Sequence, residues 1–268
     1  MKRPNCLSIA GSDPSGGAGV QADLRTFAAL GCHGMAVVAA LTAQNSLGVR
    51  ATHVPPAEFL GAQIDAVLDD VDVAAIKIGM LGDAANVAAV ARRLRARALK
   101  FVVLDPVLAA SSGDALAGGD VAGAIVRELL PLVDLATPNV AEAARLCGDA
   151  EACDVEGRRR QARALMARGA KAVLMKGGHV AGDESVDLLF DGEGELALSA
   201  PRVATRNTRG TGCTLSSAIA AHMALGLALR DAVAAAKDFL TGALRGDDLH
   251  VGAGPQPLDH FWQHRTKP

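Results

Sequence analysis

The chain has 268 residues, 50% of them apolar, and a formal net charge of −2. This length allows one large core or two small ones, and no apolar run is long enough to cross a bilayer. Aromatic residues make up only 3%, which leaves few platforms for stacking nucleic-acid bases, and the five cysteines are scattered without a C-x-x-C pair. We therefore expect a cytoplasmic protein that binds neither nucleic acid nor a membrane.

Short apolar runs alternate along the chain with longer helical patterns. The runs predicted to be strands are Cys6–Ala10, Met35–Leu41, Val73–Ile78, Phe101–Leu104, Val133–Ala136, Ala172–Met175, Val186–Phe190 and Leu196–Ser199. The predicted helices are Val20–Leu30, Pro56–Leu68, Ala84–Ala98, Val121–Leu130, Val140–Leu146, Val155–Arg168, Cys213–Leu225 and Arg230–Leu244. This alternation predicts an α/β fold with a mostly parallel sheet, in which the last two strands form an antiparallel hairpin. Since no linker or repeat interrupts the pattern, residues 1–268 are expected to form a single domain.

Segments rich in glycine or polar residues stand at the carboxyl ends of the predicted strands. They are Gly11–Gly19, Thr42–Asn45, Asp105–Val107, Thr137–Asn139 and Lys176–His179. The first has neither the G-x-G-x-x-G spacing of a dinucleotide fingerprint nor the Gly-Lys-Ser/Thr of a Walker A loop. Because ligands of open α/β sheets bind beyond the carboxyl ends of the strands, the sequence predicts a binding site at this edge.

The segment Asn207–Cys213 places glycines and a cysteine directly before a helical pattern. The first N–H groups of a helix have no intrahelical partner and its dipole makes this end positive, so Gly210 and Gly212 would let these groups converge on an anion. A thiol at this place, Cys213, is expected to have a lowered pKa and to serve as a base or nucleophile. The alternative is a glycine-rich helix start with a buried structural cysteine.

Four polar side chains at the strand ends are candidates for phosphate and metal binding. Lys176 suits a phosphate, or is an ordinary surface lysine. Asp105 and Glu142 could hold Mg²⁺, although Asp105 could instead cap the next turn, and Asn139 with Glu142 has nearly the spacing of a capping box. With the segment 210–213, these residues would supply positioned phosphates, Mg²⁺, a base and positive dipoles, which are what phosphoryl transfer needs.

Two residues in the first third of the chain could contact a small molecule. Gln44 offers both donors and an acceptor, which could bind the edge of an aminopyrimidine or bond to the backbone of its own loop. Asp23 lies one to two turns into the first predicted helix, where an acid either complements the helix dipole or contacts a ligand.

Several of these segments occur in a characteristic order over the whole chain. They are Ile9–Gly19, Leu41–Asn45, Lys77–Leu81, Asp105–Val107, Thr137–Asn139, Lys176–His179, Asn207–Cys213 and Leu258–Trp262. In this order they resemble the hydroxymethylpyrimidine/phosphomethylpyrimidine kinases of thiamine biosynthesis, a branch of the ribokinase-like superfamily. The resemblance implies a three-layer α/β/α fold and a homodimer. It also implies ATP- and Mg²⁺-dependent phosphorylation of 4-amino-5-hydroxymethyl-2-methylpyrimidine and then of its monophosphate.

The resemblance also implies roles for individual residues. Cys213 would be the base or proton acceptor, with an anion hole and a phosphate contact formed by Gly210, Thr211, Gly212 and Lys176. The pyrimidine pocket would consist of Gln44, Gly11, Ala18, Asp23, Met80 and Val107. The nucleotide side would include Lys176, Asn139, Thr208 and Lys237, and the Mg²⁺ site would consist of Asp105 and Glu142.

Two places depart from the family pattern, Arg209 and, more mildly, Ser46-Leu47 after Asn45. Arg209 stands where many relatives have histidine, and it could favour phosphate or point to solvent. The same branch includes pyridoxal kinases, which act on a similar ring hydroxymethyl group, although Gln44 favours the aminopyrimidine. A pyridoxal or pyridoxine kinase is therefore the alternative enzyme, and a pyrimidine-binding protein without catalysis is the alternative outside enzymes.

Overall fold

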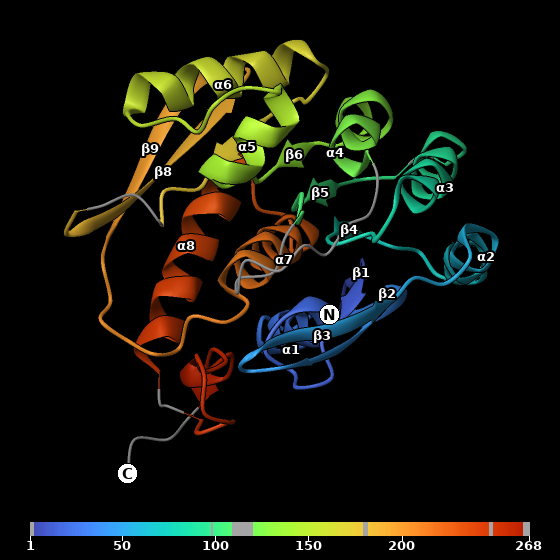
Figure 1. The fold of residues 1–268 in the computed structure, drawn as a ribbon, viewed down its shortest axis with the longest axis horizontal. Helices are drawn as coiled ribbons and strands as arrows, with labels where there is room; N and C mark the ends of the chain where they lie inside the picture. The colour runs from blue at the N-terminus through green and yellow to red at the C-terminus, as the bar shows by residue number, and fades with distance from the viewer. Residues whose placement is uncertain (1–2, 98, 109–119, 179–181, 247–248, 265–268) are drawn as a thin grey trace.

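A single mixed sheet runs through the computed structural model. The structure describes residues 3–97, 99–108, 120–178, 182–246 and 249–264, and within them the strand order is β3-β2-β1-β4-β5-β6-β7-β8-β9 (Figure 1). The strands from β2 to β7 in this order are parallel, whereas β3, β8 and β9 pair antiparallel with their neighbours. The strands are β1 Asn5–Ser12, β2 His33–Asn45, β3 Gly48–His53, β4 Ala75–Ile78, β5 Val102–Leu104, β6 Leu135–Ala136, β7 Val173–Met175, β8 Glu184–Asp191 and β9 Gly194–Pro201.

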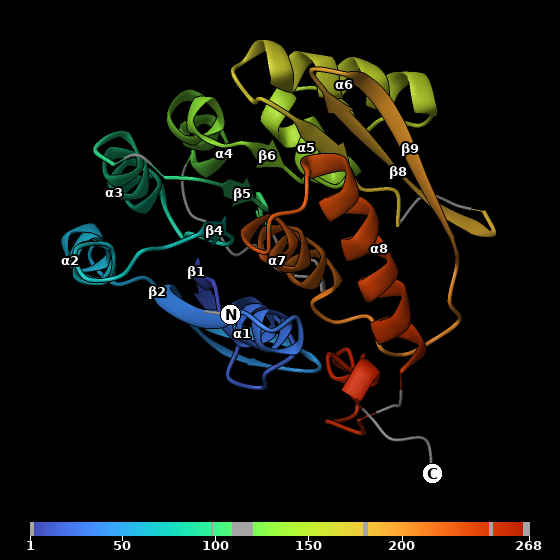
Figure 2. The ribbon, with the colours of Figure 1, turned by 180° about the vertical axis from the view of Figure 1, so that it is seen from behind.

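Helices cover both faces of the sheet (Figures 1 and 2). Helices α2 to α6 share one apolar core with the sheet, and α1, α7 and α8 share the other, so the predicted three-layer α/β/α fold is confirmed. The helices are α1 Gly19–Ala29, α2 Ala57–Leu68, α3 Ala84–Arg95, α4 Val121–Ala124, α5 Val140–Cys147, α6 Val155–Ala167, α7 Thr211–Ala224 and α8 Leu229–Arg245. None of the helices in the described ranges combines the length and apolar character needed to cross a membrane.

Alternation along the central strands decides which side chain meets which core. In β4, Ile76 and Ile78 pack in the core beneath α2 and α3, while Ala75 packs in the core beneath α1 and α7. Each buried isoleucine stabilises the fold by about 1.5–3 kcal/mol, and a slip of one residue would lose both, so the register is strongly specified. The same alternation turns Lys77 toward α1 and α7, where it is fully buried.

The structure differs from the predicted elements at two places. Strand β3, Gly48–His53, was not predicted, because it is an edge strand whose mostly exposed side chains show no apolar alternation. The helix predicted over 121–130 keeps its α form only through Ala124. A π-helical turn, Ile125–Leu129, and a short 3₁₀ turn, Leu130–Leu132, follow it, and Pro131 cannot continue an α-helix because it has no N–H.

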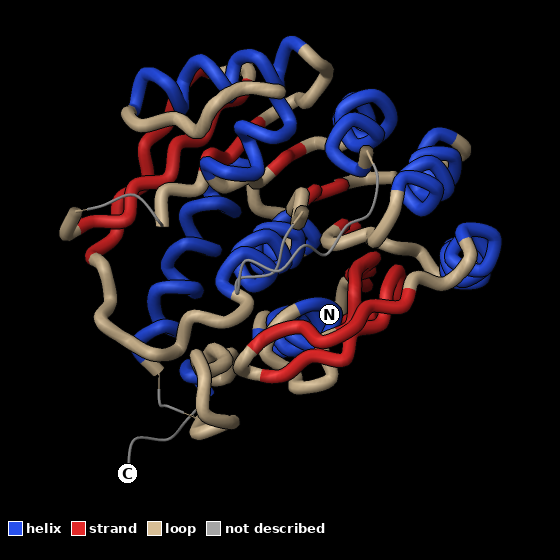
Figure 3. The backbone as a smooth tube through the Cα atoms, viewed as in Figure 1, coloured by secondary structure: helices blue, strands red, loops and turns tan. Residues whose placement is uncertain are grey.

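The predicted hairpin near the end of the sheet is confirmed. Strands β8 and β9 pair from Glu184 with Pro201 to Asp191 with Gly194. Loops and turns, tan in Figure 3, join the strands to the helices, and those that leave the carboxyl ends of the parallel strands surround one cavity.

Candidate active site

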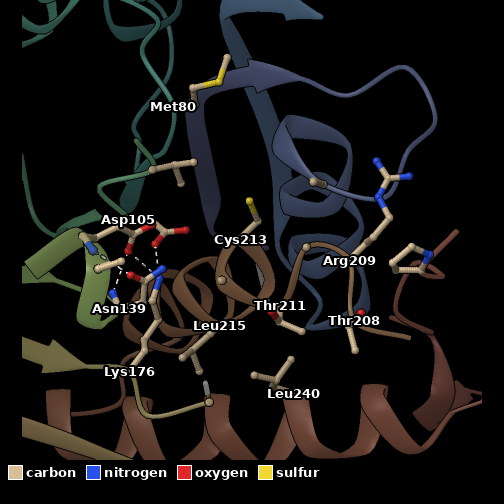
Figure 4. A pocket seen from close by; sticks show the side chains of 18 of the residues that line it. Met80, Asp105, Asn139, Lys176, Thr208, Arg209, Thr211, Cys213, Leu215 and Leu240 are labelled. Carbon is tan, nitrogen blue, oxygen red and sulfur yellow. Dashed lines mark hydrogen bonds and ion pairs between the residues drawn. The ribbon is translucent and has the colours of Figure 1, made fainter. Parts of the chain in front are cut away.

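A cavity of ≈ 1080 Å³ lies at the carboxyl edge of the parallel strands, where the sequence predicts the site (Figure 4). It brings together segments from opposite ends of the chain. Nearly all the predicted site residues line it: Gly11, Ala18, Gln44, Met80, Asp105, Val107, Asn139, Glu142, Lys176, Thr208, Gly210, Thr211, Gly212, Cys213 and Lys237. Asp23 is the exception, and His179 of the Lys176 motif lies outside the described residues.

The start of helix α7 forms one wall of the cavity. Gly210 precedes the helix with a φ of +77°, and a Cβ at this position would collide with the backbone carbonyl of Gly17. No side chain caps this end, so the first N–H groups of the helix, at 211–213, are without an intrahelical partner. These residues line the cavity at the positive end of the helix dipole, which is the geometry of an anion site.

The Cys213 sulfur lies where two helix starts meet, because the N–H of Gly19, the first residue of α1, donates a hydrogen bond to it. Burial nevertheless raises the pKa of the thiol to about 11, with Lys77 opposing the rise and Asp23 and Asp105 adding to it. The expectation of a lowered thiol pKa is therefore wrong. Desolvation and nearby carboxylates outweigh the favourable N–H groups and the lysine, and the thiol is protonated at neutral pH.

Asp23 does not line the cavity, which corrects its prediction as a substrate contact. It is fully buried on α1, and both carboxylate oxygens lie within 2.9 Å of Lys77 Nζ. The Ser8 hydroxyl donates to one oxygen at 2.6 Å and the Ser217 hydroxyl to the other at 2.8 Å. With these donors in place, the carboxylate is held beneath the site rather than presented to a ligand.

Lys176 lies between two carboxylates. Its Nζ is 2.6 Å from Asp105 Oδ1 and 3.5 Å from Glu142 Oε2. Burial lowers the pKa of Lys176, but the two carboxylates outweigh burial and raise the pKa above its usual value. Burial also raises the pKa of Glu142, a rise that Lys176 opposes. Lys176 is thus a charged phosphate candidate and not a surface lysine.

The capping box expected at 139–142 is present. Asn139 Oδ1 accepts from the Glu142 N–H at 2.8 Å, and Glu142 Oε2 accepts from the Asn139 N–H at 2.7 Å. Both residues nevertheless line the cavity, so capping fixes the carboxylate of Glu142 beside Lys176. Asp105 Oδ2 is buried and has no hydrogen-bond partner within the described part of the chain.

Arg209 does not point to solvent, although it lines the cavity. It is buried, with Nη2 2.7 Å from Asp13 Oδ2 and Nη1 donating to Ser15 Oγ at 2.9 Å. Asp13 also accepts from the backbone N–H groups of Ser15, Gly17 and Ala18. The pair therefore ties the glycine loop after β1 to the segment that precedes α7.

The opposite side of the cavity is less polar. Met80 is buried against Gly11, where a Cβ would lie only 2.6 Å from Met80 Cε, so glycine is needed for this contact. Val107 and Met80 belong to a small apolar cluster at this end of the sheet. Gln44 lies at the cavity wall, where the Thr42 hydroxyl is shared between the Ser12 carbonyl at 2.9 Å and Gln44 Oε1 at 3.2 Å. The arrangement suits a small, flat, partly apolar ring.

Lys237 enters the wall from α8. Its Nζ is 2.7 Å from Asp187 Oδ2, and Asp187 Oδ1 accepts from the Gly177 N–H at 2.7 Å. A chain of contacts therefore connects α8 to the loop that carries Lys176.

Three residues that contribute to the site were not predicted from the sequence. Asp13 had a signal, because an aspartate two residues before a serine in a glycine loop is typical of a carboxylate that bonds to backbone N–H groups. Lys77 also had one, as the charged residue of the four-residue strand Ala75–Ile78. Asp187 had none, since it lies on an ordinary strand and its partners come from distant elements.

Comparison with known proteins finds relatives over almost the whole chain. A family model described as phosphomethylpyrimidine kinase matches residues 13–259. A hydroxymethylpyrimidine/phosphomethylpyrimidine kinase of Rhizobium meliloti (strain 1021) is 53% identical over 256 residues, 95% of this chain and 96% of the relative.

Solved structures of kinases are similar over almost the whole chain. The pyridoxal kinase from Staphylococcus aureus in complex with AMP-PCP and pyridoxal has a TM-score of 0.90 at 30% identity, covering 99% of this chain and 96% of that one. The phosphomethylpyrimidine kinase from Clostridium difficile 630 has a TM-score of 0.79 at 37% identity, covering 90% of this chain and 99% of that one.

Proposed function

The chain belongs to the phosphomethylpyrimidine kinase family, and from this premise we propose that Cys213 and the first amides of α7 carry out its phosphoryl transfer. The enzyme uses ATP to phosphorylate 4-amino-5-hydroxymethyl-2-methylpyrimidine and then its monophosphate, in thiamine biosynthesis. The observation that carries the proposal is the uncapped start of α7, which lines the cavity together with the Cys213 thiol.

In this reaction the hydroxymethyl oxygen forms a bond to the γ-phosphorus of ATP while the bond to the bridging oxygen of ADP breaks. The hydroxyl proton passes to the Cys213 thiolate. The N–H groups at 211–213 and Lys176 compensate the charge on the transferring oxygens. For the second phosphorylation the acceptor is the phosphate of the monophosphate, and the same positive groups hold it.

We propose Asp105 and Glu142 as the Mg²⁺ site. The unpartnered Asp105 Oδ2 is an oxygen of the kind Mg²⁺ prefers, and Glu142 lines the same wall. The described residues hold no cluster of three or more His, Cys, Asp or Glu side chains suited to a metal. Two carboxylates still fit Mg²⁺, which keeps waters and is bound largely through substrate phosphates. When bound, it would neutralise charge on the phosphates.

The test of the Cys213 role is the variant Cys213→Ser. Turnover should fall about 10²–10⁴-fold, as for removal of a general base, while the KM for the pyrimidine changes little. In the native enzyme, turnover should rise with pH above neutral, because only the thiolate accepts a proton and the thiol pKa is about 11. Cys147→Ser, at a half-buried free cysteine that is not among the residues lining the cavity, is the matched control. Equal losses of binding and turnover would instead assign Cys213 a packing role.

A pyridoxal kinase remains the second candidate, because solved pyridoxal kinases share the fold over almost the whole chain. The Gln44 amide at the cavity wall favours an aminopyrimidine, which offers both a donor and an acceptor. Purified protein, ATP and Mg²⁺ should convert the hydroxymethylpyrimidine to mono- and diphosphate, identified by mass. Preferred phosphorylation of pyridoxal in a parallel reaction would overturn the assignment.

We also propose a homodimer formed through the hairpin of β2 and β3. Leu41 and Leu47 are 47% and 69% exposed, on or next to an edge strand, and exposed large apolar side chains of this kind favour a partner surface. Sedimentation should therefore show a dimer, and Leu47→Glu should shift it toward monomer. A native monomer at micromolar concentration would contradict this surface.

A further inference from the structure

A buried charge cluster lies directly beneath the active-site cysteine. Lys77 and Asp23 are both completely buried, and Lys77 Nζ is 2.8 and 2.9 Å from the two Asp23 oxygens. Ser8 and Ser217 donate the remaining hydrogen bonds to Asp23. The cluster joins β1, α1, β4 and α7, and the carboxylate has a donor or cation on each oxygen.

Sequence spacing places this cluster under Cys213. Asp23 follows Gly19 by one helical turn on α1, and Ser217 follows Cys213 by one turn on α7. Gly19 is the residue whose N–H donates to the sulfur. The first turns of the two helices thus hold the thiol and its N–H donor. The Ser217–Asp23 hydrogen bond lies one helical turn further along both helices. Lys77 enters between them from β4 and also lines the cavity, whereas Asp23 does not.

Packing alone does not account for such a cluster. A buried ion pair is usually no more stabilising than apolar side chains of similar volume, since desolvation of both charges offsets their attraction. Ala75, two residues earlier on the same face of β4, packs in an apolar core, so an apolar side chain would be compatible with position 77. A charge retained here is therefore better explained by what it does to its neighbours, of which Cys213 is the reactive one.

We propose that Lys77 is a positioning residue that stabilises negative charge on the Cys213 sulfur, and that Asp23 limits how much of this stabilisation the sulfur receives. The proposal rests on the role of Cys213 as proton acceptor. In the transfer step the proton leaves the substrate hydroxyl for the sulfur, so thiolate must first be present. Lys77 increases its amount through its positive charge. Asp23 holds Lys77 in place and partly neutralises it.

The pKa values point in the same direction. Burial raises the pKa of Cys213, the charge of Lys77 is the main influence that lowers it, and Asp23 and Asp105 raise it further. In return, burial lowers the pKa of Lys77 while Asp23 and Cys213 raise it, and the net result is a raised pKa, so the lysine is charged at neutral pH. The charged groups that interact electrostatically with the sulfur are thus Lys77, Lys176, Asp23 and Asp105.

The proposal is tested by the alkylation rate of Cys213 with iodoacetamide. The rate is followed between pH 7 and 10 by mass spectrometry of the peptide that carries Cys213. Below the thiol pKa this rate follows the thiolate fraction, so one unit of pKa changes it tenfold. We expect Lys77→Met to label about tenfold more slowly and Asp23→Asn several-fold faster than the native chain. The double variant should lie between native and Lys77→Met, because Lys77 approaches the cavity and Asp23 does not.

The controls separate this effect from changes in overall charge or folding. Lys100→Met removes an exposed lysine that pairs with Asp72 on the surface, and should leave the labelling unchanged. The exposed thiol of Cys153, measured in the same samples, is an internal reference. If Lys77→Met does not fold, the double variant, which leaves no unpaired buried charge, replaces it and must still label more slowly than the native chain.

The outcomes distinguish this proposal from the role of Cys213 itself. Equal labelling rates in the folded variants, or slower labelling of Asp23→Asn, would overturn the effect of Lys77. If the rates follow the expected order but Cys213→Ser retains full turnover, the electrostatic effect stands and the proton-acceptor role fails. If both hold, kcat should fall in Lys77→Met and the acid limb of its pH profile should move to higher pH, with KM nearly unchanged.

Discussion

Two of the lysines that line the cavity, Lys77 and Lys176, differ in their surroundings. Lys77 has no exposed side-chain area and shares one fully hydrogen-bonded carboxylate with two serines. Lys176 is 13% exposed and lies between two carboxylates, one of which keeps a buried oxygen without a partner in the described structure. In the Lys77 cluster both carboxylate oxygens have partners within the protein, whereas in the Lys176 cluster one carboxylate oxygen has none in the described structure.

The difference shows that a binding site can be recognised by a buried polar atom that has no hydrogen-bond partner. Nearly all buried polar groups in folded proteins have partners, so an unpartnered carboxylate oxygen on a cavity wall indicates a ligand or an ion. A complete cluster gives no such signal and can act only through the field it exerts on its neighbours. This contrast supports the proposals that the Lys176 cluster binds a ligand or ion and that the Lys77 cluster acts on the neighbouring thiol.

Of the variants that test this comparison, Lys176→Met should have the largest effect on turnover. Removal of a cation that faces the transferring phosphoryl group should lower kcat about 10²–10³-fold. It also leaves Asp105 and Glu142 close together without a counter-charge, which lowers thermal stability. Mg²⁺ should restore that stability, because the carboxylates are then free to bind it.

The same melting experiment on Lys77→Met should show no rescue by Mg²⁺, since Asp23 does not line the cavity. Lys171→Met, at an exposed lysine paired with Asp134, is the control and should melt like the native chain with and without the ion. Rescue of both cavity variants, or of neither, would show that the two clusters do not differ in the way proposed.

Arg209→Met tests a third buried ion pair, Arg209 with Asp13. Its charged groups have partners within the protein, as in the Lys77 cluster, but this pair joins two loops. Breaking a buried ion pair costs about 3–5 kcal/mol, and the lower end applies here because Asp13 keeps its backbone donors. Urea unfolding should measure the loss, and the KM for the pyrimidine should rise because the loop after β1 is released. Arg209→Lys keeps the charge but loses the two-pronged contact, and should fall between. An unchanged KM would show that the loop is held by its own backbone bonds.

Much of this site could be predicted from sequence because each parallel strand ends at the same edge. Residues such as Lys176 and Asp105 therefore had to lie near one another once the strand pattern was recognised. The burial of Asp23 could not be predicted in this way, since it depends on Lys77 arriving from another strand. The direction of the Cys213 pKa shift could not be predicted for the same reason. A helix start lowers the pKa of the thiol, but desolvation and the nearby carboxylates, which are visible only in the fold, outweigh that effect.

Arg209 shows the limit of motif reasoning in one residue. Its position beside an anion hole suggests phosphate binding or exposure, yet its guanidinium is engaged by Asp13, which lies at the other end of the chain. The edge strand β3 escaped prediction for the opposite reason. Local alternation identifies strands only where one face is buried, and most side chains of β3 are exposed.

The smallest predicted effect concerns the buried pair of His260 and Thr214, which carries no charge at neutral pH. It shows what burial does to the stability of the fold when a group is forced to ionise. His260 Nε2 lies 3.0 Å from the Thr214 hydroxyl, just after Cys213 on α7, and burial together with Arg25 lowers the pKa of His260 from 6.5 to about 4. The unfolded chain therefore binds more protons than the folded one between these values. The stability from His260 is fully present above pH 6.5 and is lost as pH falls toward 4. Between pH 7 and pH 5 the loss should be about 2 kcal/mol, measured by urea unfolding. His260→Gln cannot titrate and should lose correspondingly less stability over this interval. Equal losses in the two proteins would place the acid sensitivity in the carboxylate clusters rather than in this pair.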